Sequence, residues 1–349
     1  MKKQQITMFK KIILSSLIIF TFGTLEAQKL NYFVEASHFL DNREYSGNSD
    51  KYAISQTMLG ARLNGMLGAK IDSTQGFMAG INYLYEYGDK IDGNTPTVNL
   101  FYHYQKDGLT GLLGSFPRRG LLDYPLALLS DSLDNYRPNI QGAYLEARGT
   151  WGYENFWCDW TGRQRSNVRE SFLAGLYGRI NLSPTLFFDH YFYMFHKALY
   201  GGHLEDDHIR DNGAFALLFG ADFTKQTSLR ELSFKAGVLG CYDRDRPDPK
   251  LHFWAGGFVQ AHIYAKKIGV DASYYRGGKL RVANGDGLYQ SGNYGRLDFA
   301  YIPVENKYVS SRAAICFHMV DGALLNSQQL SLTLKLGAFC KTHHNKMPK

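Results

Sequence analysis

The chain lacks the features that mark most soluble enzymes and helical membrane proteins. After Ala27 no stretch approaches the ~18 consecutive apolar residues of a spanning helix, which excludes a bundle of transmembrane helices. It has no G-x-S-x-G, no H-E-x-x-H and no phosphate-binding glycine loop. It also has no basic stripe of the kind that nucleic-acid-binding proteins carry. A helical membrane protein is thus excluded, and no sequence motif indicates a soluble enzyme or a nucleic-acid-binding protein.

Residues 1–27 have the layout of a cleaved secretory signal. Four lysines precede an apolar run at residues 12–22, and the small residue Ala27 stands at the predicted cut. The run is shorter than the ~18–20 residues of a membrane anchor. Since this segment holds four lysines and one glutamate, its removal lowers the net charge from +7 to +4. We therefore predict export, with only a modest positive charge on the mature chain.

Cysteine is scarce, and only 9 of the 349 residues are proline. The four cysteines, Cys158, Cys241, Cys316 and Cys340, fall in four different predicted strands. A disulfide needs Cα atoms within about 7 Å of each other, which this placement disfavours. We predict free thiols, even in the oxidising compartment that a secretory signal implies.

Glycine and aromatic residues are abundant, and they follow a period of two. The chain has 36 Gly, 24 Tyr and 23 Phe. In GFMAGINYLYEYGD, residues 76–89, an apolar and aromatic row alternates with small or polar residues. Strict alternation predicts a β-strand with one apolar face. Helical spacing barely occurs in the rest of the chain.

The same period recurs in about sixteen segments along the chain. Most are roughly 9–14 residues long, which is the length that a tilted membrane strand needs. The segments begin near Leu30, Tyr52, Phe77, Val98, Leu109, Gln141, Phe156, Ser171, Leu186, Ala214, Leu232, Phe253, Ile268, Leu297, Tyr308 and Leu330.

The connections between these segments sort by length. Alternate connections are short, such as 106–108 and 266–267, and the others include the long stretches 116–138 and 276–295. Outer-membrane barrels show this arrangement, with short turns in the periplasm. A backbone in hydrocarbon must satisfy its hydrogen bonds internally, so the sheet must close. We predict an all-β fold: a transmembrane antiparallel β-barrel of about 16 strands, with short periplasmic turns and long extracellular loops.

Two stretches support a resemblance to known proteins. LGSFPRRGLLDYPLALLSDSLDNYRPNIQGAYLEAR, residues 113–148, reads as a strand, a long insertion and the next strand. FWCDWTGRQRSNVRESFLAGLYGRI, residues 156–180, is similar to the aromatic-plus-arginine hairpins of Bacteroidetes-type barrels. Together with the architecture, they make the chain resemble a Gram-negative outer-membrane porin-like β-barrel protein. The resemblance implies a water-filled barrel in the outer membrane and a possible homo-oligomer.

The signal layout, the strand pattern and the resemblance together suggest a division of the chain. Residues 1–27 are the expected signal peptide, 28–340 the barrel, and 341–349 a basic C-terminal tail. The insertion at about 116–138 is expected to fold inward, because its leucines need a place to bury. Such barrels usually end on an aromatic residue, whereas here ten residues follow Phe339.

From the resemblance we predict a channel for passive diffusion of small hydrophilic solutes. Because the chain lacks the sequence motifs of enzymes, we predict that it is not an enzyme. Two alternatives remain open: a selective pore for acidic saccharides, and a plugged barrel that acts as an adhesin or receptor through its long extracellular loops. No cofactor is expected. The expected partners are outer-membrane lipid and lipopolysaccharide, the barrel-assembly machinery and small hydrophilic solutes, with no nucleic acid.

Charged residues on the inward face and in the insertion are predicted to line the pore or its constriction. Basic and acidic groups nearly balance on the inward face, which favours weak charge selectivity. The predicted residues are Arg62, Glu86, Arg118, Arg119, Asp123, Asp131, Asp134, Arg148, Asp159, Arg163, Arg179 and Arg312.

One segment has a composition that could bind a divalent cation. GGHLEDDHIRDNG, residues 201–213, contains His203, Asp206, Asp207 and His208. These ligand types lack a recognisable spacing, so a solvated polar loop is the simpler interpretation, and no metal site is predicted.

Three histidines are candidates for chemistry on the barrel wall. A barrel-borne lipase could recruit His190, His196 or His318. None of them has a serine partner with a recognisable neighbourhood, which is why no catalytic residue is predicted.

Overall fold

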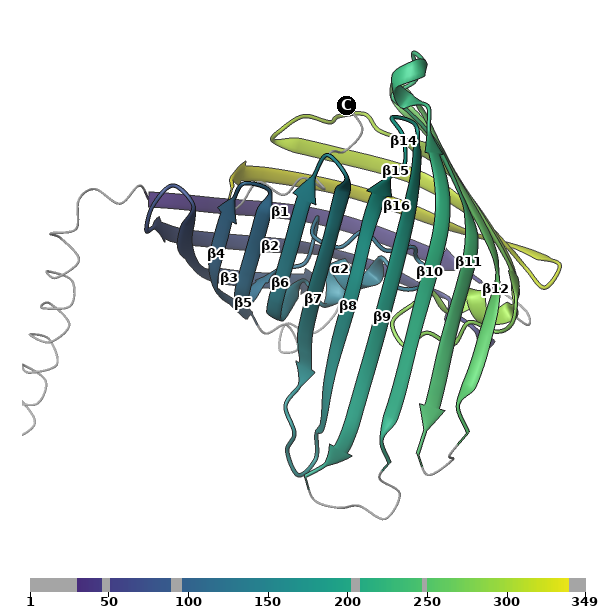
Figure 1. Cartoon of the computed structure of the whole chain (residues 1–349), viewed down its shortest axis with the longest axis horizontal. Helices are drawn as coiled ribbons and strands as arrows, with labels where there is room; N and C mark the ends of the chain where they lie inside the picture. Colours follow the sequence, from purple (N-terminus) through teal and green to yellow (C-terminus); the bar gives the residue numbers. More distant parts are fainter. Residues whose placement is uncertain (1–29, 46–50, 89–95, 202–207, 247–249, 339–349) are drawn as a thin grey trace, which may run out of the picture.

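The computed structural model describes residues 30–45, 51–88, 96–201, 208–246 and 250–338. Sixteen strands within these ranges form one closed antiparallel barrel, in which β1 also pairs with β16 (Figure 1). The predicted all-β barrel is therefore confirmed, including its number of strands. Every neighbouring pair of strands is also consecutive in the chain, apart from the closing pair.

The strands are β1 (Leu30–Glu44), β2 (Gln56–Lys70), β3 (Gln75–Glu86), β4 (Thr97–Lys106), β5 (Leu109–Pro117), β6 (Asn139–Gly149), β7 (Gly152–Gly162), β8 (Arg169–Asn181), β9 (Leu186–Tyr200), β10 (Arg210–Asp222), β11 (Glu231–Asp245), β12 (His252–Ala265), β13 (Ile268–Gly277), β14 (Asn293–Tyr301), β15 (Val309–Val320) and β16 (Ala323–Gly337).

The two rims of the barrel differ in their connections. On one rim β4–β5 and β12–β13 are joined by two-residue turns, in which Asp107 and Lys266 have positive φ. The other rim holds the connections 118–138 and 278–292, although β15 and β16 are also joined there by a tight turn. The rim with the long loops is the extracellular one by the usual rule for such barrels. In Figure 1 this rim faces the lower edge of the view, where β7–β10 extend beyond β3–β6.

The outward face of the barrel is apolar. Outward side chains remain exposed along all the strands, for example Val98 and Phe219, which are both 65% exposed. A continuous apolar surface of this extent would be unfavourable in water and is what lipid requires. The alternation that the sequence shows is thus the alternation between lipid and lumen.

Two extracellular connections fold into the lumen. The β5–β6 loop (118–138) contains the short helix α2 (Ser132–Tyr136), and the β13–β14 loop (278–292) contains the 3-10 helix η5 (Gly287–Ser291). The two loops are joined to each other by backbone hydrogen bonds, from Ser130 N to Asn284 O at 2.8 Å and from Asp286 N to Leu126 O at 2.8 Å. Together they fill the part of the lumen nearest the extracellular rim.

Leucines of these two loops pack against aromatic side chains of the inner wall. Leu121, Leu128 and Leu288 are almost fully buried, in one cluster with Trp157 and Tyr177. The hydroxyl of Tyr177 donates to the carbonyl of Leu121 at 2.7 Å, which ties the β5–β6 loop to the wall. The barrel therefore has a packed interior near one rim.

None of the helices among the described residues is long and apolar enough to cross a membrane. Cys158, Cys241 and Cys316 are free thiols, as the sequence predicts, while Cys340 lies outside the described residues.

Candidate functional site

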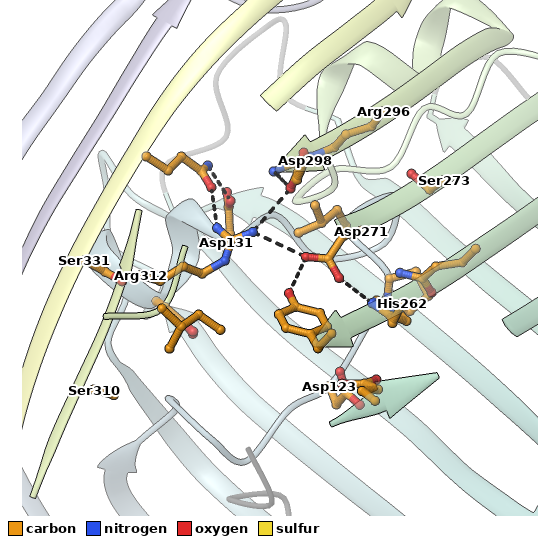
Figure 2. Close-up of a pocket in the computed structure, with 18 of the residues that line it drawn as sticks. Asp123, Asp131, His262, Asp271, Ser273, Arg296, Asp298, Ser310, Arg312 and Ser331 are labelled. Carbon is orange, nitrogen blue, oxygen red and sulfur yellow. Dashed lines mark hydrogen bonds and ion pairs between the residues drawn. The ribbon is translucent and has the colours of Figure 1, made fainter. Parts of the chain in front are cut away.

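The lumen contains a polar cavity of about 830 Å³ bordered by the β5–β6 loop. Figure 2 shows that Arg312 reaches toward both Asp271 and Asp298. Its guanidinium lies 3.4 Å from Asp271 and 3.6 Å from Asp298. Arg296 binds Asp298 at 2.8 Å. The charges that face the cavity are thus largely paired with one another.

The predicted residues Arg118, Arg119 and Asp159 hold the β5–β6 loop to the wall. Arg118 forms an ion pair with Asp159 in which both side chains are almost fully buried. Arg119 lies 3.6 Å from Glu35 of β1 and donates to the Asn135 side chain at 3.2 Å. These arginines therefore anchor the loop to two separate strands of the wall, β7 and β1.

Arg62 and Glu86, also predicted from the sequence, contact the same loop. Arg62 donates to the Asn82 side chain at 2.6 Å and to the backbone carbonyl of Asn135. Glu86 accepts a hydrogen bond from the hydroxyl of Tyr136 at 2.6 Å. Both residues thus contact α2 from neighbouring strands.

The three aspartates of the loop, Asp123, Asp131 and Asp134, line the cavity. Burial raises the pKa of Asp131, but the charges of Arg296 and Arg43 outweigh it, so that its pKa lies below the ordinary value. For Asp134 burial prevails and raises the pKa of the carboxyl group, although Arg119 opposes this shift.

Of the remaining predicted residues, Arg179 borders the same cavity. Arg179 forms a bidentate pair with Asp189, at 2.6 and 2.9 Å, and Lys235 also lies 2.9 Å from Asp189. Arg148 lies 3.1 Å from Glu146 near the periplasmic rim.

Arg163 follows β7 on the extracellular rim and is exposed, so the structure does not bring it to the lumen. Of the weak metal candidates, His203, Asp206 and Asp207 lie outside the described residues, and His208 lies 2.9 Å from Asp245. No group of three or more potential ligands that could hold a metal ion occurs within the described ranges.

The lumen also contains histidines with a hydrogen-bonded partner. Nδ1 of His262 lies 2.7 Å from Asp271, beside the cavity in Figure 2. Nε2 of His318 lies 3.0 Å from Oγ of Ser327, and its Nδ1 lies 2.7 Å from the hydroxyl of Tyr294. A tyrosine can donate as well as accept, so it does not set the tautomer of His318 as a carboxylate would.

Two further histidine–carboxylate pairs lie on the outward face of the wall. On β9 the even-numbered side chains face outward, because the odd-numbered Asp189 and Tyr191 are buried in the lumen. His190 and His196 therefore face lipid. Nε2 of His190 lies 2.8 Å from Glu154, and Nδ1 of His196 lies 2.7 Å from Asp211.

The geometry of the His196 pair suits base catalysis. An ionised carboxylate only accepts hydrogen bonds, so in the neutral imidazole Nδ1 carries the proton and Nε2 the lone pair. Among the described residues Nε2 has no hydrogen-bond partner. The imidazole side chain is 27% exposed, against 9% for His190. His196 is thus an oriented base with an accessible nitrogen.

Aromatic and basic groups surround this pair. The ring of Phe172 contacts His196 at 5.2 Å between centroids and stacks on Trp160. On the other side Asp211 accepts a hydrogen bond from Arg246 at 3.0 Å. Arg244 faces Asp211 across the β10–β11 ladder and therefore shares its outward face.

The height of His196 on the wall matches the edge of the hydrocarbon. His196 is ten residues above Leu186, at the periplasmic end of β9, or about 33 Å along a strand and roughly 25 Å along the membrane normal at the usual tilt. The apolar band of such barrels is about 25 Å tall. By the same rule His190 lies near the middle of the band. His196 and Asp211 thus lie where lipid headgroups begin.

The sequence singled out His196 but not Asp211 or Arg244. Both faces of residues 187–195 are aromatic. The alternation therefore does not show whether the side chain of His196 faces lipid or the lumen. Asp211 and Arg244 lie on the apolar row of their strands, where a charge is costly and therefore informative. Only the strand register places the three side chains in one row.

Comparison with solved structures supports the fold. A loop-deletion mutant of OmpT, an outer membrane protein of Vibrio cholerae, is 10% identical, with a TM-score of 0.56; the match covers 89% of this chain and 100% of that one. The trimer form of OmpT is 8% identical, with a TM-score of 0.54 and the same coverage. At these identities the likeness shows the fold alone.

Comparison of the sequence with known families identifies a family for the chain. No curated protein matches the chain. The model of a family described as lipid A 3'-O-deacylase-type matches residues 22–347, nearly the whole chain.

This match overturns two of the predictions made from the sequence. Passive diffusion of small solutes is the wrong function for a chain of this family, and the prediction that the protein is not an enzyme is wrong as well. The channel rested on the resemblance to porin-like barrels, and the second prediction rested on the absence of a sequence motif for catalysis. Here the potential catalytic groups come from separate strands, which no linear motif records.

Proposed function

The chain belongs to the lipid A 3'-O-deacylase-type family, and on that premise we propose that it hydrolyses the ester at the 3' oxygen of lipid A in the outer membrane. The observation that carries the proposal is the His196–Asp211 pair on the outward wall. It lies at the height where the polar part of an outer-leaflet lipid meets its acyl chains. An ester that joins a sugar to an acyl chain lies at this boundary.

Access to lipid distinguishes this pair from the others. A lipid in the outer leaflet reaches His196 by lateral diffusion, without leaving the bilayer. To reach His262 it would have to enter a lumen that the β5–β6 loop and the β13–β14 loop occupy. His190 lies too deep in the hydrocarbon for a sugar ester of the outer leaflet.

The residues support a hydrolysis with water as the nucleophile. Nε2 of His196 accepts a proton from water as the water oxygen attacks the ester carbonyl carbon, and Asp211 stabilises the imidazolium that forms. Arg246 supplies positive charge near the tetrahedral oxyanion. When the bond from the carbonyl carbon to the 3' oxygen breaks, the imidazolium returns its proton to that oxygen. The products are a fatty acid and a lipid A with a free 3' hydroxyl.

The test uses purified, refolded protein and lipid A in mixed micelles. We expect mass spectrometry to show the loss of one acyl chain, with the position of the new hydroxyl at 3' assigned by fragmentation. His196→Gln is expected to slow this loss by about 100-fold or more, because a general base contributes factors of that size.

The matched control is His262→Gln, which removes a histidine with the same kind of carboxylate partner from the other side of the wall. It is expected to change the rate less than about 2-fold, since substitutions away from a site have small effects. Equal losses in the two variants, or none in His196→Gln, would refute the assignment of His196. No release of acyl chain from any lipid A by the wild-type protein would refute the proposed function itself.

A further inference from the structure

Arg244 is a basic group beside the outward pair that the hydrolysis does not use. We propose that Arg244 binds the phosphate that lipid A carries on the 4' carbon, next to the 3' ester. This inference rests on the proposed function, because it deepens the recognition of the same substrate. It would make the enzyme selective for lipid A phosphorylated at 4'.

The strand register places Arg244 within reach of such a phosphate. His196 faces Asp211 across one ladder, and Asp211 faces Arg244 across the next. With strands about 4.8 Å apart, the Cα atoms of His196 and Arg244 are about 10 Å apart on one face of the wall. The long side chain of Arg244 can span much of this gap. An ester at His196 and a phosphate on the adjacent sugar carbon fit between the two residues.

Arg244 and Arg246, the two arginines of this row, differ in their hydrogen-bond partners. The guanidinium of Arg246 already binds Asp211 at 3.0 Å and thereby helps to fix the partner of His196. Among the described residues the guanidinium of Arg244 forms no hydrogen bond or ion pair, and its Nε is buried without a partner. Asp245, between them in sequence, is paired with His208. Arg244 therefore has donors left for an anion.

A guanidinium is the group best suited to hold a phosphate at this position. Its planar fork donates two parallel hydrogen bonds to phosphate oxygens, and such charge-assisted bonds are about twice as strong as neutral ones. The location at the membrane boundary lowers the local dielectric and strengthens the attraction. The phosphate would thus fix the sugar so that its 3' ester meets His196.

The experiment compares three lipids with matched acyl chains: 1,4'-bisphosphoryl lipid A, the 1-dephosphorylated form and the 4'-dephosphorylated form. We expect wild-type protein to deacylate the first two at similar rates and the third at least about 10-fold more slowly. Arg244→Gln is expected to slow the first two by a similar factor and to leave the third unchanged. Arg244→Gln and removal of the 4' phosphate together form a double-mutant cycle, and non-additive effects show that the residue and the phosphate interact.

Arg276→Gln is the matched control, because Arg276 is an exposed arginine at the extracellular end of β13, away from His196. It is expected to leave all three rates unchanged. If Arg244→Gln slowed all three lipids equally, Arg244 would be a general lipid anchor and the proposal would be wrong. Equal rates of the wild-type protein on the three lipids would also overturn it.

A measurement of lipid binding tests the phosphate site independently of the proposed hydrolysis. His196→Gln is mixed with fluorescent analogues of the three lipids in detergent, and their affinities are measured by anisotropy. We expect it to bind the two 4'-phosphorylated lipids at least about 10-fold more tightly than the third, and to lose this preference when Arg244→Gln is added. If wild-type protein deacylated nothing but this preference was found, the phosphate site would stand and the hydrolase would not.

Discussion

The barrel presents nearly the same chemical pair on both sides of its wall. Outside, Nδ1 of His196 binds Asp211 at 2.7 Å; inside, Nδ1 of His262 binds Asp271 at the same distance. The inner carboxylate also accepts from Tyr264 and lies near Arg312, so it belongs to a dense network. The outer one has only Arg246 besides its histidine among the described residues.

The same pair of side chains can therefore have different roles on the two sides of the wall. Charges in the lumen can form pairs with several neighbours, since all inner faces converge there. A charge on the outer wall meets lipid and has few partners, which makes its presence costly. We therefore assign structural roles to the inner networks and a role in substrate chemistry to the outer pair.

The largest expected effect tests the carboxylates rather than the histidines. Asp211→Asn keeps the size of the side chain, but its amide NH2 can donate to Nδ1. His196 then carries its proton on Nε2 and loses the carboxylate that stabilises its charged form. We expect the rate of lipid A deacylation to fall between about 100-fold and 10,000-fold. Steady-state assays of Asp211→Asn and Asp271→Asn make the comparison, and a larger loss in Asp271→Asn would place the chemistry in the lumen.

Next in size is the removal of a lumenal charge. Asp189 has a fully buried side chain and joins Arg179 to Lys235. Asp189→Asn leaves both cations without their carboxylate, which should lower the free energy of unfolding by about 3 to 5 kcal/mol. Urea titration of the barrel in lipid vesicles measures this. Folded Asp189→Asn should still deacylate lipid A at nearly the wild-type rate; an unchanged stability would contradict the structural role.

A smaller effect is expected at the second outward pair. Gly178 lies between Glu154 and His190, and a Cβ there would come within 2.7 Å of Oε2 of Glu154 and 2.4 Å of the Tyr153 carbonyl. Gly178→Ala should therefore lower the free energy of unfolding by about 1 to 3 kcal/mol. Deacylation should persist, because this pair lies below the proposed site. A selective loss of activity in a stable Gly178→Ala protein would shift the site to His190.

The smallest expected effect is on acid stability. The pKa of Asp131 lies below its ordinary value of 3.8 because Arg296 and Arg43 outweigh the effect of burial. A lowered pKa means that the ionised carboxylate stabilises the fold above the ordinary value, and that this contribution disappears as the pH falls through the lowered one.

The side chain of Asp131 is 41% exposed to lumenal water, which screens its charge. We therefore expect Asp131→Asn to lower the free energy of unfolding by only about 0.5 to 1 kcal/mol near pH 7. The difference from wild type should vanish as the pH drops well below 3.8. Urea titrations of both proteins from pH 7 to 2 check the trend; a gap that widens in acid would reverse the sign of the argument.

Much of the fold could be read from the sequence, and much of the site could not. The alternation at Leu59 to Leu67 or Leu330 to Leu336 predicts which side chains meet lipid, and these leucines are exposed on the outer wall. On β9 the alternation fails, because Tyr191 and Tyr193 fill the lumen while Phe192 faces lipid. Where both environments accept the same side chains, the pattern holds no information about direction.

The alternation and the sorted loops specify a closed barrel with lipid outside, because a backbone in hydrocarbon has only one way to satisfy the hydrogen bonds of such strands. The folded barrel, in contrast, is needed to show that His196, Asp211 and Arg244 share one row. Their spacing along the chain reflects loop lengths, whereas their spacing in space follows from the register of three strands.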